Sequence, residues 1–488
     1  MKRVTLIVGV LLSAGCVGTP SVGGVAGTAP APNKEWSPPA PPRDTLPSTP
    51  SSLPADLASR VSTLTLGDVV DLALRNNPET QISWANARSA AAAYGGSKGL
   101  YYPTIDAQIG VNYLKSSPTF TNDSVLRPSL TQTNYGPTFS VSWLIADLGG
   151  RAGTIESARQ ALIAANWTHN ATLQNVVLEV ESAYFNYMAN KGLVEAEHLS
   201  VQEAETSLES TQERQRVGLA TIADVLQAKT ALSQATLTLE TTEGDLQTTR
   251  GALAAAMGLP ANVPYDIDAA PVTSVGPATD SVDALIATAV KSRPDLASAQ
   301  AQYRQAVADV RSVRGNLFPS IQATGTGGRT YVRTLPSGAS NYTLSVGLAI
   351  PIFSGFSRQY AVKQARAEAD AALGRAASVK QQVQFQVFSS YYALQTAARR
   401  VNTADDLLAS AQSSEDAALG RYRAGVGLFV DLLTAQSALA SARAQQVQAR
   451  WVWQTALAQL AHDTGVLDTG GNTNIRVTPD TTREAPPK

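Results

Sequence analysis

Few residues of this 488-residue chain have both a type and a spacing that could do chemistry. The histidines His169, His198 and His462 are isolated, without a second histidine four residues on, a cysteine pair or a carboxylate at ligand spacing. Because metal sites need several such ligands together, we predict surface or interface packing for all three, no metal and no cofactor. The glycine-rich run 325–328 does not lead from a strand into a helix, so it is not a nucleotide-binding loop. The sequence therefore predicts that the chain is not an enzyme.

Two aspartates at matching places are better candidates for a functional charge. Asp224 lies six residues after Gly218, and Asp431 lies six residues after Gly425, each within a stretch of helical pattern. Glycine permits the left-handed backbone that a tight turn between two helices needs. Both aspartates are therefore expected near the tip of a helical hairpin.

The residues that precede the two aspartates differ. Thr221 lies three residues before Asp224, which is the spacing of a capping box, so helix capping is a sufficient explanation for Asp224. Leu428 stands at the matching place before Asp431 and has no hydroxyl group. Asp431 is therefore the stronger candidate for a functional role.

Matching places recur because the chain is a tandem duplication. Pro103 returns as Pro319 at an offset of 216 residues, and Gly218 returns as Gly425 at an offset of 207 (319 − 103 = 216; 425 − 218 = 207). One copy has therefore lost nine residues from a loop between these points. Each half predicts a helix, two strands, a long helix, a turn and a second helix.

Each repeat contains helices that are too long for a globular domain. No proline interrupts the chain from Leu148 to Gln215, and apolar residues recur there every seven residues, as they do after Gly218. Such seams, with small residues three places further on in the second helix, predict two antiparallel coiled-coil hairpins per chain. An ordinary cytosolic coiled coil is the alternative, against which the leader and the strands argue. Shorter helices should open the halves at about Thr65–Gly99 and Ser281–Gly315, with new turns at Pro78 and Pro294.

Four segments of about ten residues alternate apolar and polar side chains, as strands with two different faces do. They are residues 104–113, 135–145, 320–332 and 342–350, and glycines weaken the pattern of the third. This length and alternation suit a membrane barrel, although a soluble sandwich would show the same pattern. Four strands cannot close in lipid, so several chains must pool them. Two chains would give a filled barrel, whereas three would give twelve strands and a water-filled lumen.

The start of the chain carries an export signal. Lys2 and Arg3 precede a short apolar stretch and small residues before Cys16, which resembles a bacterial lipobox. The resemblance implies cleavage before Cys16 and acylation of its sulfur. Val17 follows where an aspartate would signal retention in the inner membrane, and this favours the outer membrane. Ordinary secretion with an incidental Cys16 is the alternative.

These patterns predict the organisation of the whole chain. It comprises a lipoprotein signal peptide (1–15), a lipid-anchored, proline-rich tether (16–60), a first repeat (61–260), a linker (261–280), a second repeat (281–467) and a disordered tail (468–488). The tether and tail hold too few apolar residues to fold alone. The net charge of −1 argues against nucleic acid as a partner, because phosphate binding needs a clustered basic face.

The paired halves, the strands after Tyr102-Pro103 and Phe318-Pro319, and the doubled Gly-x5-Asp turns at 218–224 and 425–431 resemble the TolC family of outer-membrane efflux factors. The lipobox makes the chain similar to the lipoprotein branch represented by OprM. The resemblance implies an α+β membrane protein, namely a homotrimer with a twelve-stranded barrel in the outer membrane. An antiparallel coiled-coil tunnel would continue the barrel into the periplasm.

The resemblance also implies a function and partners. The function would be a passive exit duct for drugs or metals in a tripartite efflux system, with a type I protein secretion duct or a periplasmic lipoprotein scaffold without a pore as alternatives. The hairpin tips would bind a periplasmic adaptor protein and, through it, an inner-membrane transporter of the resistance-nodulation-division type. The tip residues expected in the adaptor contact are Gly218, Leu219, Thr221, Gly425, Val426 and Gly427.

The resemblance further implies a gate at the periplasmic end. Tyr422 matches a tyrosine that helps to bond neighbouring hairpins at the constriction, and threefold symmetry would place three copies of Asp431, and more weakly of Asp224, around the axis. Rings of carboxylates favour cations and bind multivalent ones. Two departures concern the lock: Gly427 stands where TolC has an arginine, and Thr434 stands where TolC has a second aspartate. The closed end must therefore be held differently.

Overall fold

The computed structural model describes residue 34, residues 64–116, 119–121, 124–127, 130–267, 275–333 and 338–467, and residue 475. The predicted signal peptide, Cys16, almost all of the tether and most of the tail lie outside the described residues. The described chain forms two compact units. The first unit comprises residues 88–164 and 299–376, and the second comprises residues 64–87, 165–298 and 377–475 in so far as they are described.

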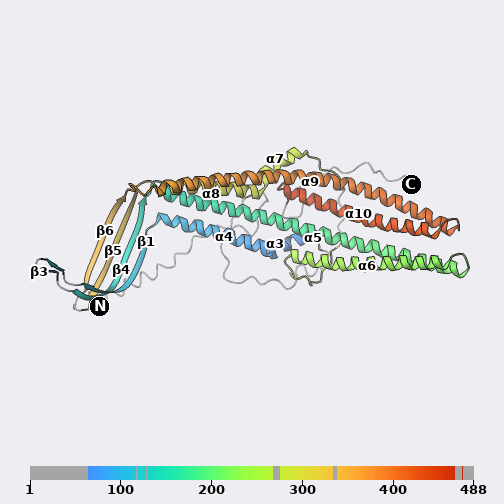
Figure 1. Cartoon of the computed structure of the whole chain (residues 1–488), viewed down its shortest axis with the longest axis horizontal. Helices are drawn as coiled ribbons and strands as arrows, with labels where there is room; N and C mark the ends of the chain where they lie inside the picture. The colour runs from blue at the N-terminus through green and yellow to red at the C-terminus, as the bar shows by residue number, and fades with distance from the viewer. Residues whose placement is uncertain are drawn as a thin grey trace. The chain divides into compact units, whose positions relative to one another are not determined.

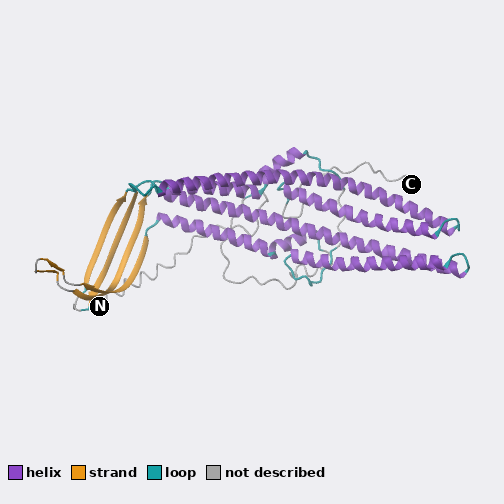
Figure 2. Cartoon of the chain, viewed as in Figure 1, coloured by secondary structure: helices purple, strands orange, loops and turns teal. Residues whose placement is uncertain are grey.

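Both halves of the chain contain the same long helices and strands in the same order (Figures 1 and 2), and the first half adds a 3-10 turn and the short strands β2 and β3. The first half contains α3 (Leu66–Asn76), α4 (Pro78–Lys98), a 3-10 turn (Gly99–Tyr101), β1 (Thr104–Ser116), β2 (Thr119–Thr121), β3 (Ser124–Arg127), β4 (Leu130–Ala146), α5 (Gly150–Arg216) and α6 (Ile222–Ala256). The second half contains α7 (Val282–Ser292), α8 (Pro294–Gly315), β5 (Ser320–Val332), β6 (Ala339–Ala349), α9 (Ser357–Arg423) and α10 (Phe429–Asp463).

The paired long helices match in length and offset. α5 and α9 each have 67 residues, and α6 and α10 each have 35. Both pairs start 207 residues apart (357 − 150 = 429 − 222 = 207). Every residue of one hairpin therefore has an equivalent in the other.

The helix that opens each half is broken at its proline. Pro78 and Pro294 are the first residues of α4 and α8, where a missing N–H costs nothing. The residues before them, Asn77 and Arg293, are extended with ψ of 127° and 118°. The prediction of new turns at the prolines is confirmed, but each opening segment is two helices rather than one.

The first unit contains an antiparallel sheet with the strand order β1-β4-β5-β6. Its apolar side chains alternate with polar ones along the strands, and every residue of β1 and β6 is exposed in the single chain, with Ile109 in β1 84% and Tyr342 in β6 90% exposed. Gly328 in β5 allows close approach to β4, since a Cβ there would lie 2.6 Å from the Pro137 carbonyl oxygen. The pair β2 and β3, which the sequence did not predict, forms a separate two-stranded sheet.

Equivalent turns lead from the sheet into the long helices. Leu148 and Gly149 have φ of 49° and 103°, and their equivalents Gly355 and Phe356 have φ of 60° and 63°. Each turn therefore holds one residue other than glycine, Leu148 or Phe356, in a backbone conformation that favours glycine. Arg151 anchors the first turn by donating hydrogen bonds to the carbonyl oxygens of neighbouring residues, the shortest at 2.7 Å.

The second unit has the larger hydrophobic core. α3, α5, α6, α7, α9 and α10 contribute to it, and Trp453 and Leu394 are fully buried. Tyr265 and Ile267 of the predicted linker are also buried there, as is Ile475 of the segment predicted to be a disordered tail. The predicted disorder is therefore wrong for Ile475, because its apolar side chain packs on the core. None of the helices in the described part of the chain is long and apolar enough to cross a membrane.

Candidate functional site

The tips of the two hairpins are tight turns of equal length. Gly218 and Gly425 have φ of 79° and 77°, the left-handed region in which a side chain is disfavoured. After the first glycine, Leu219 N–H donates to the Arg214 carbonyl oxygen at 2.7 Å, and the equivalent bond in the second tip measures 3.0 Å. These bonds close the last turn of each long helix. The predicted left-handed backbone at both glycines is confirmed.

The two tip aspartates have different surroundings. The Asp224 carboxylate accepts hydrogen bonds from Thr221 N–H at 2.7 Å and from Thr221 Oγ1 at 2.8 Å, and Asp224 N–H donates back to Thr221 Oγ1 at 3.2 Å. This is a complete capping box. Asp431 is exposed, and Leu428 at its N-cap offers no side-chain hydrogen bond. The Asp431 carboxylate is consequently available to solvent or to a ligand.

Tyr422 lies inside the tip rather than on its surface. Its side chain is buried, its ring centroid lies 5.3 Å from that of Phe429, and the Arg214 guanidinium carbon lies 4.6 Å above its ring. Because Arg214 lies in the last turn of α5, the long helix of the first hairpin, this cation–π contact joins the two hairpins of one chain. The sequence analysis missed Arg214, since nothing in its local pattern marks a contact with a residue 208 positions away (422 − 214 = 208).

Gly427 has a structural reason to lack a side chain. A Cβ at this position would lie 2.9 Å from Arg421 Cβ and 3.1 Å from Tyr422 N. Its N–H donates to the Arg421 carbonyl oxygen at 3.1 Å, so the turn folds back on the end of α9. An arginine would not fit here without a rearrangement of the turn.

Both tips expose apolar side chains. Leu219 and Val426, at equivalent positions, are 69% and 70% exposed. Val217, Ile222 and Leu428 are similarly open. Clustered apolar side chains at the end of a helical hairpin are typical of a protein contact.

The three histidines lie apart and have separate contacts. His169 is buried against Ser83 Oγ at 2.8 Å, and burial lowers the pKa of its imidazole to about 4. His198 lies 3.8 Å from the Glu243 carboxylate at the surface. The nitrogens of His462 lie 3.0 Å from Asp463 Oδ1 and 2.9 Å from Asn175 Oδ1. The described residues contain no cluster of three or more histidine, cysteine or acidic side chains that could hold a metal.

A buried ionic cluster, which no local pattern in the sequence indicates, joins α7, α8, α9 and α10. Arg293 is 6% exposed and donates to both carboxylate oxygens of Asp295 at 3.0 and 2.6 Å, and to Gln386 Oε1 at 2.9 Å. Asp463 Oδ1 lies 3.5 Å from the same guanidinium. Burial alone would raise the pKa of the Asp295 carboxyl, but the hydrogen bonds and charge of Arg293 lower it overall. Each buried charge is therefore compensated.

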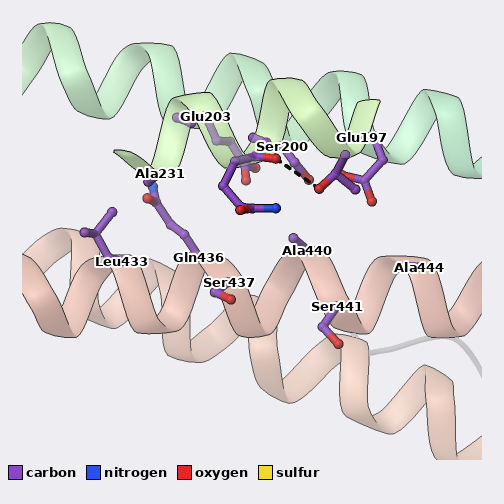
Figure 3. Close-up of a pocket in the computed structure, with 14 residues that line it drawn as sticks. Glu197, Ser200, Glu203, Ala231, Leu433, Gln436, Ser437, Ala440, Ser441 and Ala444 are labelled. Atoms are coloured by element: carbon purple, nitrogen blue, oxygen red, sulfur yellow. Dashed lines mark hydrogen bonds between the residues drawn. The ribbon is translucent and has the colours of Figure 1, made fainter. Parts of the chain in front are cut away.

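A cavity of about 310 Å³ lies where α5, α6 and α10 meet (Figure 3). Much of its wall consists of small residues, including Ala231, Ala440 and Ser441. Glu203 at its edge pairs with Arg443 at 2.7 Å. The cavity follows from the small residues between the hairpins, and of the two glutamates in its wall, Glu197 and Glu203, the second already has a cationic partner.

The strands alternate apolar and polar residues over a length that spans a membrane, and each pair of strands leads into a long antiparallel helical hairpin. This combination is typical of a channel-forming protein of the outer membrane. The comparisons with known proteins agree. The chain belongs to the outer membrane efflux protein family, whose model matches residues 69–259 and 285–466.

Individual relatives are distant but cover most of the chain. It is 27% identical over 410 residues to the protein CyaE of Bordetella pertussis, with 80% of this chain and 81% of that protein aligned. It is 24% identical over 386 residues to the probable efflux pump outer membrane protein TtgC of Pseudomonas putida, with 78% of each aligned. The solved structure of the outer-membrane channel OprN matches with a TM-score of 0.73 at 19% identity, covering 87% of this chain and 98% of that one. The predicted family resemblance and fold are confirmed.

Proposed function

We propose that three copies of this chain form a passive duct through the outer membrane that carries small molecules out of the periplasm. The observation that carries the proposal is the four-stranded sheet, whose outer strands β1 and β6 each pair on one side only within the described chain. Unpaired strand edges in lipid cost several kcal/mol per group, so the edges must meet between chains. Three copies would supply twelve strands, enough for a water-filled lumen.

The assembly can be tested with the purified protein. We expect a trimer in detergent and stepwise ion conductance after reconstitution into planar bilayers. A monomer that binds membranes without conductance would favour the alternative of a lipoprotein scaffold without a pore.

The hairpin tips are the proposed binding surface for a periplasmic adaptor protein, through which an inner-membrane transporter of the resistance-nodulation-division type would deliver cargo. The exposed apolar residues Leu219 and Val426 support this assignment. Replacing both with glutamate should abolish binding of the adaptor encoded with the protein and leave conductance unchanged. Equal adaptor binding by this variant would move the contact away from the tips.

The cargo class proposed here is small molecules such as drugs or metals, in keeping with the name of TtgC as a probable efflux pump outer membrane protein. A type I protein secretion duct is the second candidate. Deleting the gene separates the two, because loss of an efflux duct sensitises cells to small toxic compounds, whereas loss of a secretion duct removes a protein from the medium.

We assign the periplasmic gate to Asp431, with Asp224 and Tyr422 as secondary members. The exposed Asp431 carboxylate would form a ring of three negative charges, favour cations and bind trivalent cations added from the periplasmic side. Asp224 is the weaker candidate because its carboxylate is held by Thr221. Arg421 and Arg423 in the last turn of α9 are the competing charges.

Single-channel recording tests this gate. Asp431→Ala should remove most of the cation preference and of the trivalent block, while Asp431→Glu should retain both and leave trimer stability unchanged. Anion preference in the unmodified channel would show that the arginines dominate. Unchanged block in Asp431→Ala and in Asp224→Ala would return both aspartates to a role in helix stability alone.

A further inference from the structure

The equivalent helices α5 and α9 differ on one face. Phe185 and Ala196 on α5 are buried, each 8% exposed. Their equivalents on α9 are Tyr392 and Thr403 (392 − 185 = 403 − 196 = 207), and both are exposed, Tyr392 by 47%. The same face of the duplicated helix is therefore buried on α5 and exposed on α9.

The covered face of α5 packs against α10, the second helix of the other repeat. The rings of Phe185 and Trp451 stack with their centroids 6.2 Å apart. Two turns further along α5, a Cβ at Gly192 would lie 3.0 Å from Val447 Cγ1, which sets the register of the two helices. The cavity in Figure 3 lies in the same contact nearer the tips.

The equivalent of α10 in the first repeat is α6, and its equivalent face is also open. Glu240 and Gly244 stand where α10 has Val447 and Trp451 (447 − 240 = 451 − 244 = 207), and both are exposed. A Cβ at Gly244 would meet nothing within 4 Å. Each chain thus forms one helix contact, between α5 and α10. The equivalent faces of α9 and α6 are both exposed, and we call them the two open halves of a second contact.

The open half on α9 is apolar enough to require cover. Phe385, Phe388 and Tyr392 follow each other at helical spacing and are 70%, 48% and 47% exposed. An aromatic strip of this kind on a helix marks an interaction site. Because the two open halves are complementary rather than identical, they join copies head to tail, and such contacts form a ring when the rotation between copies closes, as it does in a trimer.

We propose that this aromatic strip of α9 packs on α6 of a second copy of the chain, in the register that α5 and α10 show within one chain. The inference rests on the trimer proposed above and specifies its helical interface. It pairs Tyr392 with Gly244 of the neighbouring copy, and Arg399 with Glu240 of the neighbouring copy.

The residue types support this register. Where α5 and α10 stack two aromatic rings, α9 and α6 present one ring and one glycine, so Tyr392 has room above Gly244. Where α5 and α10 bring Gly192 against Val447, α9 and α6 present Arg399 and Glu240, which carry opposite charges. Both of these side chains are exposed, and neither forms an ion pair among the described residues. Charge complementarity fixes the register of an interface and rejects wrong pairings.

Cysteine cross-linking tests the proposal. Cys16 is the only cysteine, so a Cys16→Ser protein with a substituted export signal carries only the introduced thiols. When trimers of the Arg399→Cys/Glu240→Cys variant are oxidised, we expect covalent dimers and trimers, which a reducing agent should convert back to monomers. The matched control Gly192→Cys/Val447→Cys should close within one chain and run as a monomer. Arg400→Cys/Glu240→Cys, displaced by one residue, should cross-link far less.

Charge exchange provides the second measurement. Arg399→Glu and Glu240→Arg should each reduce the fraction of trimer that survives mild electrophoresis, and the double variant should restore it. A stable trimer in which the Arg399/Glu240 cysteine pair does not cross-link would overturn this interface while leaving the proposed duct intact. A protein that is monomeric in detergent would overturn the proposed trimer and the interface together.

Discussion

Glu181 in α5 gives a testable pH dependence of stability. Its side chain is 1% exposed, and neither carboxylate oxygen has a hydrogen-bond partner within the described chain. Burial raises the pKa of this carboxyl from 4.5 to about 7. The folded protein therefore favours the neutral acid, whereas the unfolded chain ionises at its ordinary pKa.

The sign and size of the effect follow from this difference. Below the unfolded pKa of 4.5 both states are neutral, and Glu181 costs nothing. As the pH rises to about 7, only the unfolded state gains charge, so stability is lost until the folded state ionises as well. A difference of about 2.5 pKa units corresponds to ~3 kcal/mol per chain at most.

Glu181→Gln removes the titration and keeps the shape of the side chain. We expect the variant to unfold at a higher temperature than the unmodified protein at about pH 8 and at a similar temperature at about pH 4, a window set by the linkage of ionisation to folding. Far-UV circular dichroism of the protein in detergent measures both.

The buried His169 lowers the stability of both proteins as the pH falls from 6.5 to about 4, because its pKa is lowered in the folded state. This contribution is the same in the variant and in the unmodified protein, so it cancels in their difference. Glu179→Gln, two residues away on the exposed face, is the matched control and should change nothing. Parallel melting curves for Glu181→Gln and the unmodified protein at every pH would refute the reasoning.

Two further predictions concern the buried cluster and the lipid anchor. Arg293→Met leaves Asp463 buried without its cation and should lower the free energy of unfolding by about 3–5 kcal/mol, measured by denaturant titration. Arg293→Asn with Asp463→Ala copies the neutral pair Asn77 and Ala256 of the first repeat and should recover much of that loss; a double variant as unstable as the single one would contradict this explanation. Cys16→Ser should stop incorporation of labelled fatty acid, whereas labelling that persists would exclude Cys16 as the acylated residue.

The regular parts of the fold could be predicted from the sequence because their physical signals are periodic. The proline-free stretch from Leu148 to Gln215, with a seven-residue repeat inside it, located α5 to within two residues of its observed ends, Gly150 and Arg216. Alternation located the four long strands, including β5 despite its glycines. Of these glycines, Gly328 allows close approach to β4. The capping box at Thr221 was predicted because both partners lie within one helical turn.

The remaining contacts could not be predicted because their partners lie far apart in the sequence. Arg214 and Tyr422 belong to different repeats, and no local pattern indicates that a guanidinium covers that ring. The cluster around Arg293 combines residues from four helices, and only the tertiary fold brings Gln386 and Asp463 to it. The crowding at Gly427 likewise depends on how the turn folds back over α9.

Comparison of the two repeats shows how a duplicated sequence can serve two different environments. The α5–α10 contact forms within one chain, where connectivity already limits which helices can meet, and it contains stacked rings and a glycine against a valine. The proposed α9–α6 contact forms between chains, where nothing but the side chains selects the partner and the register. There the valine has become Glu240 and the glycine has become Arg399, so a steric fit has been replaced by a pair of opposite charges. A weak exposed ion pair adds little to stability, but a like-charged mismatch is costly, so this exchange favours one assembly over others.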